Sequence, residues 1–239
     1  MRTPLPRLAA SAFAAVVTMV LAVAPADAHP APFDATAGGA SAGQIAVTAV
    51  AGPFMFKDTT TGVTFTCASL TIPGHLVVGN DRPGSGIATL DASEGLWSDC
   101  AGPAGLRFQW TGYGTWSFDI DDVTNGVATG AITNMRAHVV ISQGPTCSFD
   151  VGADTGTFTS SGTSTVPPGA ETATYTNSSQ ALDLPASNPG SLGLWNVDDG
   201  SGHAYCITAA LWGQGDNLSM STSFHLTADD PGDNPIAIN

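Results

Sequence analysis

The side chains that could carry catalysis are scattered along the chain. A nucleophilic triad is defined by how its members meet in space, so the sequence alone does not exclude one. The chain has no Gly-x-Ser-x-Gly motif, and Gly84-Ser85-Gly86 lies in a predicted turn. Five histidines occur without His-Glu-x-x-His or a similar metal-binding spacing: His29, His75, His138, His203 and His225. We therefore assign no catalytic residue.

Aspartates form three groups that could supply oxygen ligands to a calcium ion. The groups are Asp119, Asp121 and Asp122, then Asp198 and Asp199, then Asp229, Asp230 and Asp233. None follows the spacing of an EF-hand loop. The run from Asp198 to Gly202 is the best candidate, yet its composition is more typical of a turn. We expect no metal site and no cofactor.

Aromatic side chains beside glycines support the main functional hypothesis. Tyr113 lies between Gly112 and Gly114, so no neighbouring side chain covers its ring. Trp195 and Trp212 also lie beside Gly-rich stretches. An exposed ring on a β scaffold presents a flat apolar face with a polar rim, which suits stacking on a sugar. We predict binding roles for Tyr113, Trp195 and Trp212.

Residues 1–28 have the features of a secretory signal peptide. Arg2 and Arg7 flank the start, an apolar run extends from about Leu8 to Ala24, and Ala26-Asp27-Ala28 offers a small-x-small cleavage site. We expect cleavage after Ala28, an extracellular location and no membrane span in the mature chain. The alternative is an uncleaved N-terminal anchor.

The chain is acidic, with a formal net charge of −14 at pH 7. After residue 28, four basic residues stand against nineteen acidic ones. Such a surface repels nucleic acid and anionic lipid, so neither is an expected partner. Only 11% of the residues are charged, while Gly, Thr and Ser are abundant, which favours a turn-rich β protein over amphipathic helices.

Four cysteines in an exported chain predict two disulfides, for which three connectivities are possible. We favour Cys67 with Cys100 and Cys147 with Cys206, because pairing in sequence order places one bridge in each half of the domain. A zinc site is the rival interpretation, but the spacing contains no Cys-x-x-Cys.

Residues 106–120 carry the most regular pattern, a period-two alternation on both sides of Gly112-Tyr113-Gly114. If these three residues form a turn, one register satisfies four facing pairs. The pairs are Leu106 with Ile120, Phe108 with Phe118, Trp110 with Trp116, and Arg107 with Asp119. Asn125-Gly126 predicts a second turn with Thr124 opposite Val127, which gives a three-stranded meander between about residues 106 and 141.

The predicted fold class is all-β, an antiparallel, meander-rich sandwich or barrel of about ten to twelve short strands. The expected organisation is a mobile N-terminal tail over residues 29–43, a single β domain over residues 44–228 and a polar C-terminal tail over residues 229–239. A change in alternation phase also predicts a β-bulge near Cys67 or Ala68.

Four stretches of the chain form a further pattern: Trp97-Ser98-Asp99-Cys100-Ala101-Gly102-Pro103-Ala104-Gly105-Leu106-Arg107-Phe108, Phe65-Thr66-Cys67, Gly130-Ala131-Ile132-Thr133 and Thr146-Cys147-Ser148-Phe149. Together they resemble a group of uncharacterised small secreted proteins of actinobacteria. The resemblance covers most of the mature chain through loose strand and cysteine patterns. It implies export and an all-β fold, and it carries over no catalytic residue.

The sequence thus favours a secreted, non-catalytic β protein that binds a glycan or surface component at or near the cell envelope. The first alternative is a structural or protein-interaction role at the cell surface. The second alternative is a secreted hydrolase whose site the sequence does not reveal.

Overall fold

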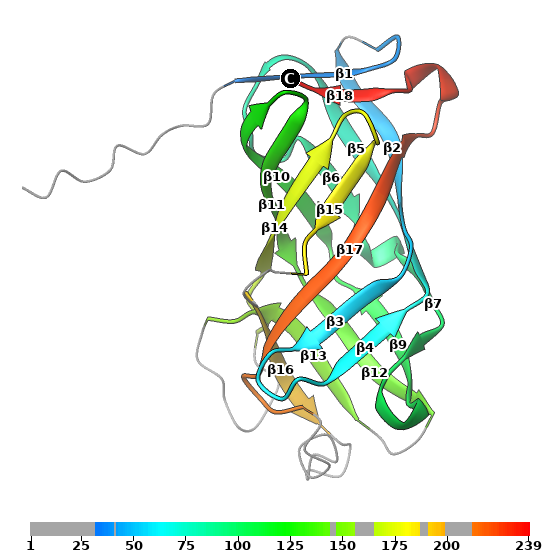
Figure 1. Cartoon of the computed structure of the whole chain (residues 1–239), viewed down its shortest axis with the longest axis vertical. Coiled ribbons are helices and arrows are strands. Elements are labelled where there is room, and N and C mark those ends of the chain that lie inside the picture. Colours follow the sequence, from blue (N-terminus) through cyan, green and yellow to red (C-terminus); the bar gives the residue numbers. More distant parts are fainter. Residues whose placement is uncertain (1–31, 41, 144–146, 156–164, 187–190, 199–211) are drawn as a thin grey trace, which may run out of the picture.

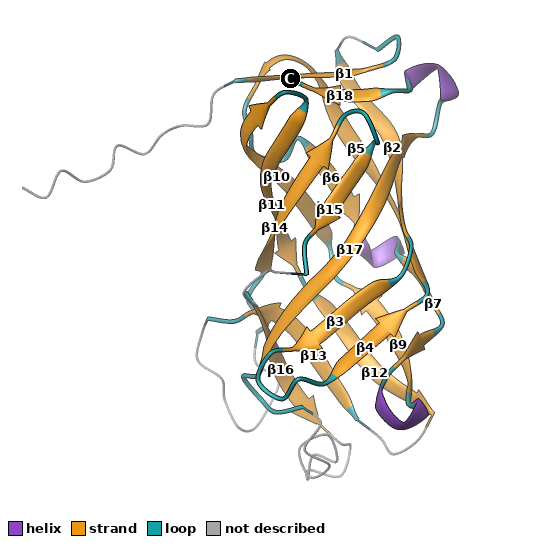
Figure 2. Ribbon diagram, in the orientation of Figure 1, coloured by secondary structure: helices purple, strands orange, loops and turns teal. Residues whose placement is uncertain are grey.

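Alternation of apolar and polar residues runs through most of the chain and builds a barrel of eight long antiparallel segments (Figure 1). The computed structural model describes residues 32–40, 42–143, 147–155, 165–186, 191–198 and 212–239. Apart from strands, these residues form only three 3-10 helices, η1 (Ala92–Glu94), η2 (Pro103–Gly105) and η3 (Pro231–Asp233) (Figure 2). In this described part, no helix has the length and hydropathy needed to cross a membrane.

Seven of the eight segments are interrupted near their middle, at a level that we call the waist, so each contributes more than one strand. In chain order the segments are β2 (Gly43–Ala51) with β3 (Phe54–Asp58); β4 (Thr64–Cys67) with β5 (Ser69–Arg82); β6 (Ala88–Asp91) with β7 (Leu96–Ser98) and β8 (Cys100–Ala101); β9 (Arg107–Gly112) with β10 (Thr115–Thr124); β11 (Val127–Met135) with β12 (Ala137–Gln143); β13 (Ser148–Ala153) with β14 (Gly169–Thr176); β15 (Ala181–Leu184) with β16 (Leu192–Asp198); and β17 (Asn217–Ala228).

The strands close two rings that are stacked end to end and share β17. The upper ring of Figure 1 runs β2, β5, β6, β10, β11, β14, β15, β17 and back to β2. The lower ring runs β3, β4, β8, β9, β12, β13, β16, β17 and back to β3. Both rings follow chain order, so the contact of β17 with the first segment is the only non-sequential closure in either ring. The protein is therefore an up-and-down β-barrel.

The predicted all-β, antiparallel class is confirmed, and of the two predicted architectures the barrel is the one observed. The predicted number of ten to twelve strands is wrong, because the described residues form eighteen. Most of the difference arises at the waist. Pro53, for example, has no N–H to donate and separates β2 from β3, and Ala68 separates β4 from β5 close to the predicted bulge.

The predicted hairpin over residues 106–120 is wrong. β9 pairs with β8 and β12, whereas β10 pairs with β6 and β11, so Tyr113 and Gly114 mark a bend within one segment. None of the four predicted facing pairs forms: Leu106 with Ile120, Phe108 with Phe118, Trp110 with Trp116, or Arg107 with Asp119. The buried residues are even-numbered both before and after the bend. Such a pattern fits one continuous strand as well as a hairpin.

The Asn125-Gly126 turn is confirmed, with Thr124 opposite Val127. Asn125 and Gly126 have φ of 53° and 74°, as a two-residue turn between twisted strands requires. A bulge between Ile120 and Asp122 then shifts the register by one residue, so that Ile120 lies opposite Gly130. The turn connects two complete segments of the barrel, whereas the prediction placed it inside a local three-stranded meander.

Both predicted tails contain strands that cover the upper end of the barrel (Figure 1). β1 (Phe33–Ala37) pairs with β5 and with β18 (Ile236–Ile238). Phe33, Ile236 and Ile238 are buried in the core. The assignment of residues 29–43 and 229–239 to tails is therefore wrong for β1 and β18, because three- and five-residue alternations are too short to be recognised in Ala-, Pro- and Asp-rich sequence.

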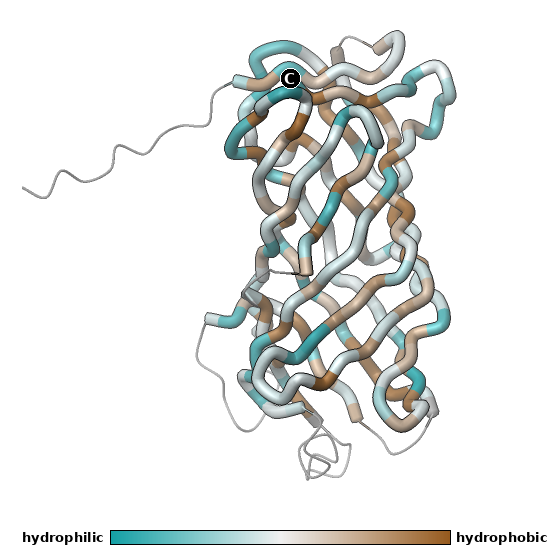
Figure 3. The backbone as a smooth tube through the Cα atoms, in the orientation of Figure 1, coloured by the Kyte–Doolittle hydropathy of each residue, from teal (hydrophilic) through white to brown (hydrophobic). Residues whose placement is uncertain are grey.

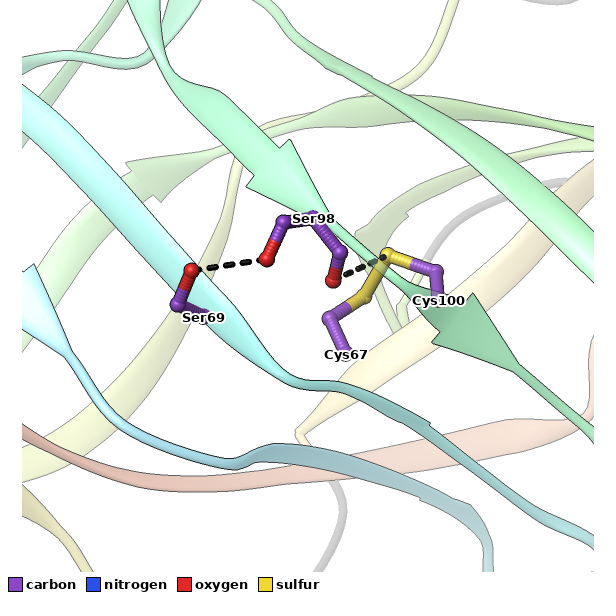
Figure 4. Close-up of a disulfide and its surroundings, with 4 residues drawn as sticks. All are labelled: Cys67, Ser69, Ser98 and Cys100. Atoms are coloured by element: carbon purple, nitrogen blue, oxygen red, sulfur yellow. Dashed lines mark hydrogen bonds between the residues drawn. A yellow bond between two sulfur atoms is a disulfide. The ribbon is translucent and has the colours of Figure 1, made fainter.

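The Cys67–Cys100 disulfide is present as predicted and joins the second and third segments near the waist (Figure 4). Beside it, the hydroxyl oxygens of Ser69 and Ser98 lie 2.7 Å apart in a hydrogen bond. Cys206 lies outside the described residues, so its predicted pairing with Cys147 stays a prediction.

The interior of the barrel is filled with side chains. Hydrophobic and hydrophilic residues alternate along the strands (Figure 3), and the inward set includes a cluster of aromatic rings in the lower ring and at the waist. The cluster consists of Phe54, Phe56, Phe65, Trp97, Phe108, Trp110, Trp116, Phe149 and Trp212. A pocket lined by Phe56, Trp110 and Trp116 has room for about one water molecule. A barrel of eight strands is narrow enough for side chains to fill, and a ligand site is therefore sought on its outer wall.

Candidate functional site

Tyr113 lies on the outer wall at the waist, where β9 bends into β10. Its backbone N–H donates to the carbonyl oxygen of Arg136 at 2.9 Å, which fixes the bend against the neighbouring segment. A Cβ at Gly112 would overlap the carbonyl oxygen of Ala92, so the bend needs glycine there. Tyr113 is 40% exposed and is the one exposed ring among the phenylalanine, tyrosine and tryptophan side chains of the described residues.

A row of polar side chains crosses the outer wall next to this ring. The register places Thr111 of β9 opposite His138 of β12, His138 opposite Asp150 of β13, and Asp150 opposite Trp195 of β16, next to Asn196. Along β12, Ala137 and Val139 point inward and are buried, so His138 between them points outward. The strand period and the register together bring these polar groups to one place.

The Asp150 carboxylate holds two neighbours. His138 Nδ1–H donates to Asp150 Oδ1 at 2.8 Å, and Asn196 Nδ2 donates to Asp150 Oδ2 at 2.7 Å. The side chain of His138 is 37% exposed, whereas that of Asp150 is 14% exposed. Because the carboxylate can only accept, it orients the imidazole with Nδ1 protonated, and in the neutral ring Nε2 is then a hydrogen-bond acceptor.

The Tyr113 ring lies close to His138, with ring centroids 6.4 Å apart and planes inclined by 26°. Partial burial and the negative charge of Asp150 raise the pKa of the Tyr113 phenol above its ordinary value of 10. The phenol therefore remains protonated at neutral pH and can donate as well as accept. We call Thr111, Tyr113, His138, Asp150 and Asn196 the waist surface.

Two of the three predicted binding residues do not lie on this surface as exposed rings. Trp195 is 2% exposed and its indole N–H donates to the carbonyl oxygen of Ala153 at 2.8 Å. Trp212 is 1% exposed and contacts Phe65, Phe108 and Phe149 in the aromatic cluster. The prediction that these rings are exposed is wrong, because a glycine neighbour does not determine how far other parts of the fold cover a side chain.

The aspartate groups noted in the sequence have separate structural roles. Asp119 accepts from the backbone N–H of Gly86 and the hydroxyl of Thr133, and Asp229 accepts from the hydroxyl of Thr48. Asp230 accepts from the N–H of Gly232 at the start of η3. Asp199 lies outside the described residues. Within the described residues, no three His, Cys, Asp or Glu side chains converge as metal ligands would.

His138, Asp150 and Asn196 were not predicted as site residues. The alternation placed His138 on the polar face of a strand, where a solvated imidazole is ordinary. The missing information was the pairing of β12 with β13, since it is the register that places His138 beside Asp150.

No family model, no curated protein and no solved structure matches the chain. The fold and the site define its class as an eight-segment up-and-down β-barrel with a packed interior and a polar-aromatic surface on its outer wall.

Proposed function

We propose that this protein is an extracellular, non-catalytic carbohydrate-binding protein that recognises a glycan at or near the cell envelope through the waist surface. The observation that carries the proposal is the exposed Tyr113 ring beside the hydrogen-bonded His138–Asp150–Asn196 row. A sugar offers an apolar C–H face for the ring and hydroxyl groups for the polar side chains.

The rigidity of the surface supports this role. Its side chains stand on paired strands of a closed barrel, and both oxygens of Asp150 are already bonded within the protein. Little side-chain freedom is then lost on binding, so the interaction costs less conformational entropy. No described residue forms a hydrogen bond with His138 Nε2, which accepts when neutral, or with the Tyr113 hydroxyl, which both donates and accepts.

The charge of the protein favours a neutral glycan. With a formal net charge of −14, the chain repels acidic polysaccharides and phosphate-bearing polymers. Asp150 adds a local negative charge directly behind His138. We therefore expect binding to uncharged polysaccharide at physiological salt, and little dependence of that binding on salt concentration.

The test is a pull-down of the oxidised protein with purified cell walls and a panel of insoluble polysaccharides, followed by affinity measurement. Tyr113→Ala is expected to weaken binding at least about tenfold, which is about 1.4 kcal/mol. Leu96→Ala is the matched control, because Leu96 is 73% exposed and lies on β7, which contributes no residue to the waist surface. Absence of binding by the parent protein, or equal binding by Tyr113→Ala, would contradict the proposal, and release of soluble sugar would indicate a hydrolase.

A second candidate function is binding to a protein partner. Val50 and Leu96 are 45% and 73% exposed and lie on either side of Thr71 in one cross-strand row of the outer wall. Exposed aliphatic side chains in a row suit a protein contact better than a sugar. Loss of cell-wall binding by Leu96→Ala with retention by Tyr113→Ala would favour this function.

A further inference from the structure

The lower ring contains a buried carboxylate that the waist surface does not use. The alternation of β3 turns Phe54, Phe56 and Asp58 inward, and Asp58 is fully buried at the lower end of that strand. Its Oδ1 accepts from the backbone N–H groups of Thr60 and Thr61 at 2.7 and 2.9 Å. Within the described residues, no N–H or hydroxyl group donates to Oδ2.

The Asp58 carboxylate is close enough to a second carboxyl group, that of Asp216, for the two to interact. The backbone holds the two segments together here, because the N–H of Thr59 donates to the carbonyl oxygen of Asn217 at 2.8 Å. Asp216 belongs to the turn before β17, where it also accepts from the backbone N–H of Gly213. The same turn is attached to β16, because the N–H of Leu194 donates to the carbonyl oxygen of Asp216 at 2.9 Å. A hydrogen bond between two carboxyl groups requires a proton on one of them.

This pair lies at the seam where the lower ring closes. Leu218 of β17 pairs directly with Asp58 of β3 on one side and with Leu192 of β16 on the other. The pairing of β16 with β17 involves only two residue pairs. The carboxyl pair therefore ties the first segment to the turn that begins the last one, at a place where the backbone ladder is short.

We propose that Asp58 and Asp216 share a single proton and form a pH-dependent latch that closes the seam of the lower ring. The proton comes from solvent and lies on Asp216, whose O–H donates to Asp58 Oδ2. When the proton is lost, two negative charges face each other in a partly buried position and repel.

The electrostatic surroundings agree with this assignment. Burial and the charge of Asp58 raise the pKa of the Asp216 carboxyl, while the N–H of Gly213 acts in the opposite direction. The described residues bring no other charged side chain to act on Asp216, and Lys57, the neighbour of Asp58, points outward. The latch is complete below the ordinary pKa of a carboxyl group and is lost as the pH rises through the raised pKa of Asp216.

The test is hydrogen exchange of the full oxidised chain, followed in peptides covering residues 54–66 and 212–222 and corrected for the intrinsic rate at each pH. Opening of the closed latch releases one proton, so the opening constant should rise about tenfold per pH unit between the ordinary and the raised pKa, and then level off. Asp216→Asn can still donate to Asp58 but does not titrate, so its opening constant should be independent of pH. Asp229→Asn, which alters an exposed aspartate, should keep the slope of the parent protein.

A flat profile in the parent protein, or an unchanged slope in Asp216→Asn, overturns the latch. Removal of the slope by added Ca²⁺ also overturns it, because a cation would then hold the pair. If Asp216→Asn does not fold, the infrared spectrum of the parent protein decides. The C=O band of a protonated carboxyl group should persist at a pH where exposed aspartates are ionised, and absence of that band contradicts the proposal.

Discussion

Asp150 accepts hydrogen bonds from two different strands, His138 on β12 and Asn196 on β16, and so fixes the polar half of the waist surface. The interaction within such a partly exposed pair contributes little to folding stability, about 0–1 kcal/mol. Its larger effect is geometric, since it sets which nitrogen of His138 carries the proton and where the ring points. The residue therefore matters more for binding than for stability.

Asp150→Asn separates these two effects. The amide accepts at its oxygen and donates at its nitrogen, so it no longer requires a proton on His138 Nδ1 and the imidazole is no longer held in one tautomer. We expect glycan affinity to fall roughly tenfold, about 1.4 kcal/mol, with a loss of folding stability of no more than about 1 kcal/mol. Titration calorimetry, urea unfolding and the nitrogen chemical shifts of the His138 ring measure the three quantities.

The control for this substitution is Asp229→Asn, since Asp229 is also a surface aspartate that accepts from a neighbour, the hydroxyl of Thr48. It should bind glycan as the parent protein does. Unchanged affinity in Asp150→Asn would mean that the orientation of His138 is not part of recognition.

Tyr113 could be found from sequence because its exposure has a local cause, the absence of side chains at Gly112 and Gly114. The same argument failed for Trp195 and Trp212, whose rings are buried although glycines lie close to them in the sequence. Asp58 and Asp216 are far apart in sequence and meet only across the seam. Contacts of this kind depend on ring closure, which no local pattern encodes.

At the scale of elements, β18 is held by side chains as well as by its neighbour β1. Gln180 accepts from the N–H of Ile236 at 2.7 Å and donates to its carbonyl oxygen at 2.7 Å, and Asn177 does the same for Ile238 at 3.0 and 2.9 Å. Each amide thus occupies the position that the backbone of another strand would take. The buried Tyr175 hydroxyl adds a bond to the carbonyl oxygen of Ile236.

Gln180→Met keeps the length of the side chain and removes both hydrogen bonds to β18. The N–H of Ile236 then loses its partner and its carbonyl oxygen keeps only the Tyr175 hydroxyl, so we expect a loss of about 1–3 kcal/mol in folding stability and faster exchange of the Ile236 amide. Urea unfolding and hydrogen exchange provide the measurements. Ser178→Ala, at an exposed neighbouring position, should leave both unchanged, and parent-like exchange of Ile236 in Gln180→Met would show that β1 alone holds the strand.

The predicted and observed elements differ most where a pattern has two physical solutions. The Asn125-Gly126 pattern is compatible with one local structure, a two-residue turn, because few residue pairs adopt two consecutive positive φ angles. That turn was predicted correctly. The Gly112-Tyr113-Gly114 pattern is compatible with two, a turn or a bend in a continuous strand, and alternation on both sides does not distinguish them. The bend forms instead of the turn because the two halves of the segment pair with other strands, β6, β8 and β12.

At the scale of the whole molecule, β17 belongs to both rings and joins them into one unit. Residues 218–221 pair with β3 in the lower ring and residues 224–228 pair with β2 in the upper ring. Each of the other seven segments contributes strands to both rings. Loss of order in one ring therefore removes pairing from the other.

We expect the two rings to unfold in one cooperative transition. The buried tryptophans report mainly on the lower ring and the waist, whereas far-ultraviolet circular dichroism reports on all strands. Urea midpoints from tryptophan fluorescence and from circular dichroism should coincide in the oxidised protein. Two separated midpoints would show that the rings unfold independently despite the shared strand.

A closed barrel has no lateral edge, and the strands over its upper end leave one candidate edge, the outer side of β18. Exposed strand edges are where separate chains add to one another and begin to aggregate. In this protein the Asn177 and Gln180 amides already occupy the N–H and carbonyl groups of Ile236 and Ile238 on that side. A second chain therefore finds no free backbone groups of Ile236 or Ile238 on that side, which blocks edge-to-edge pairing through β18.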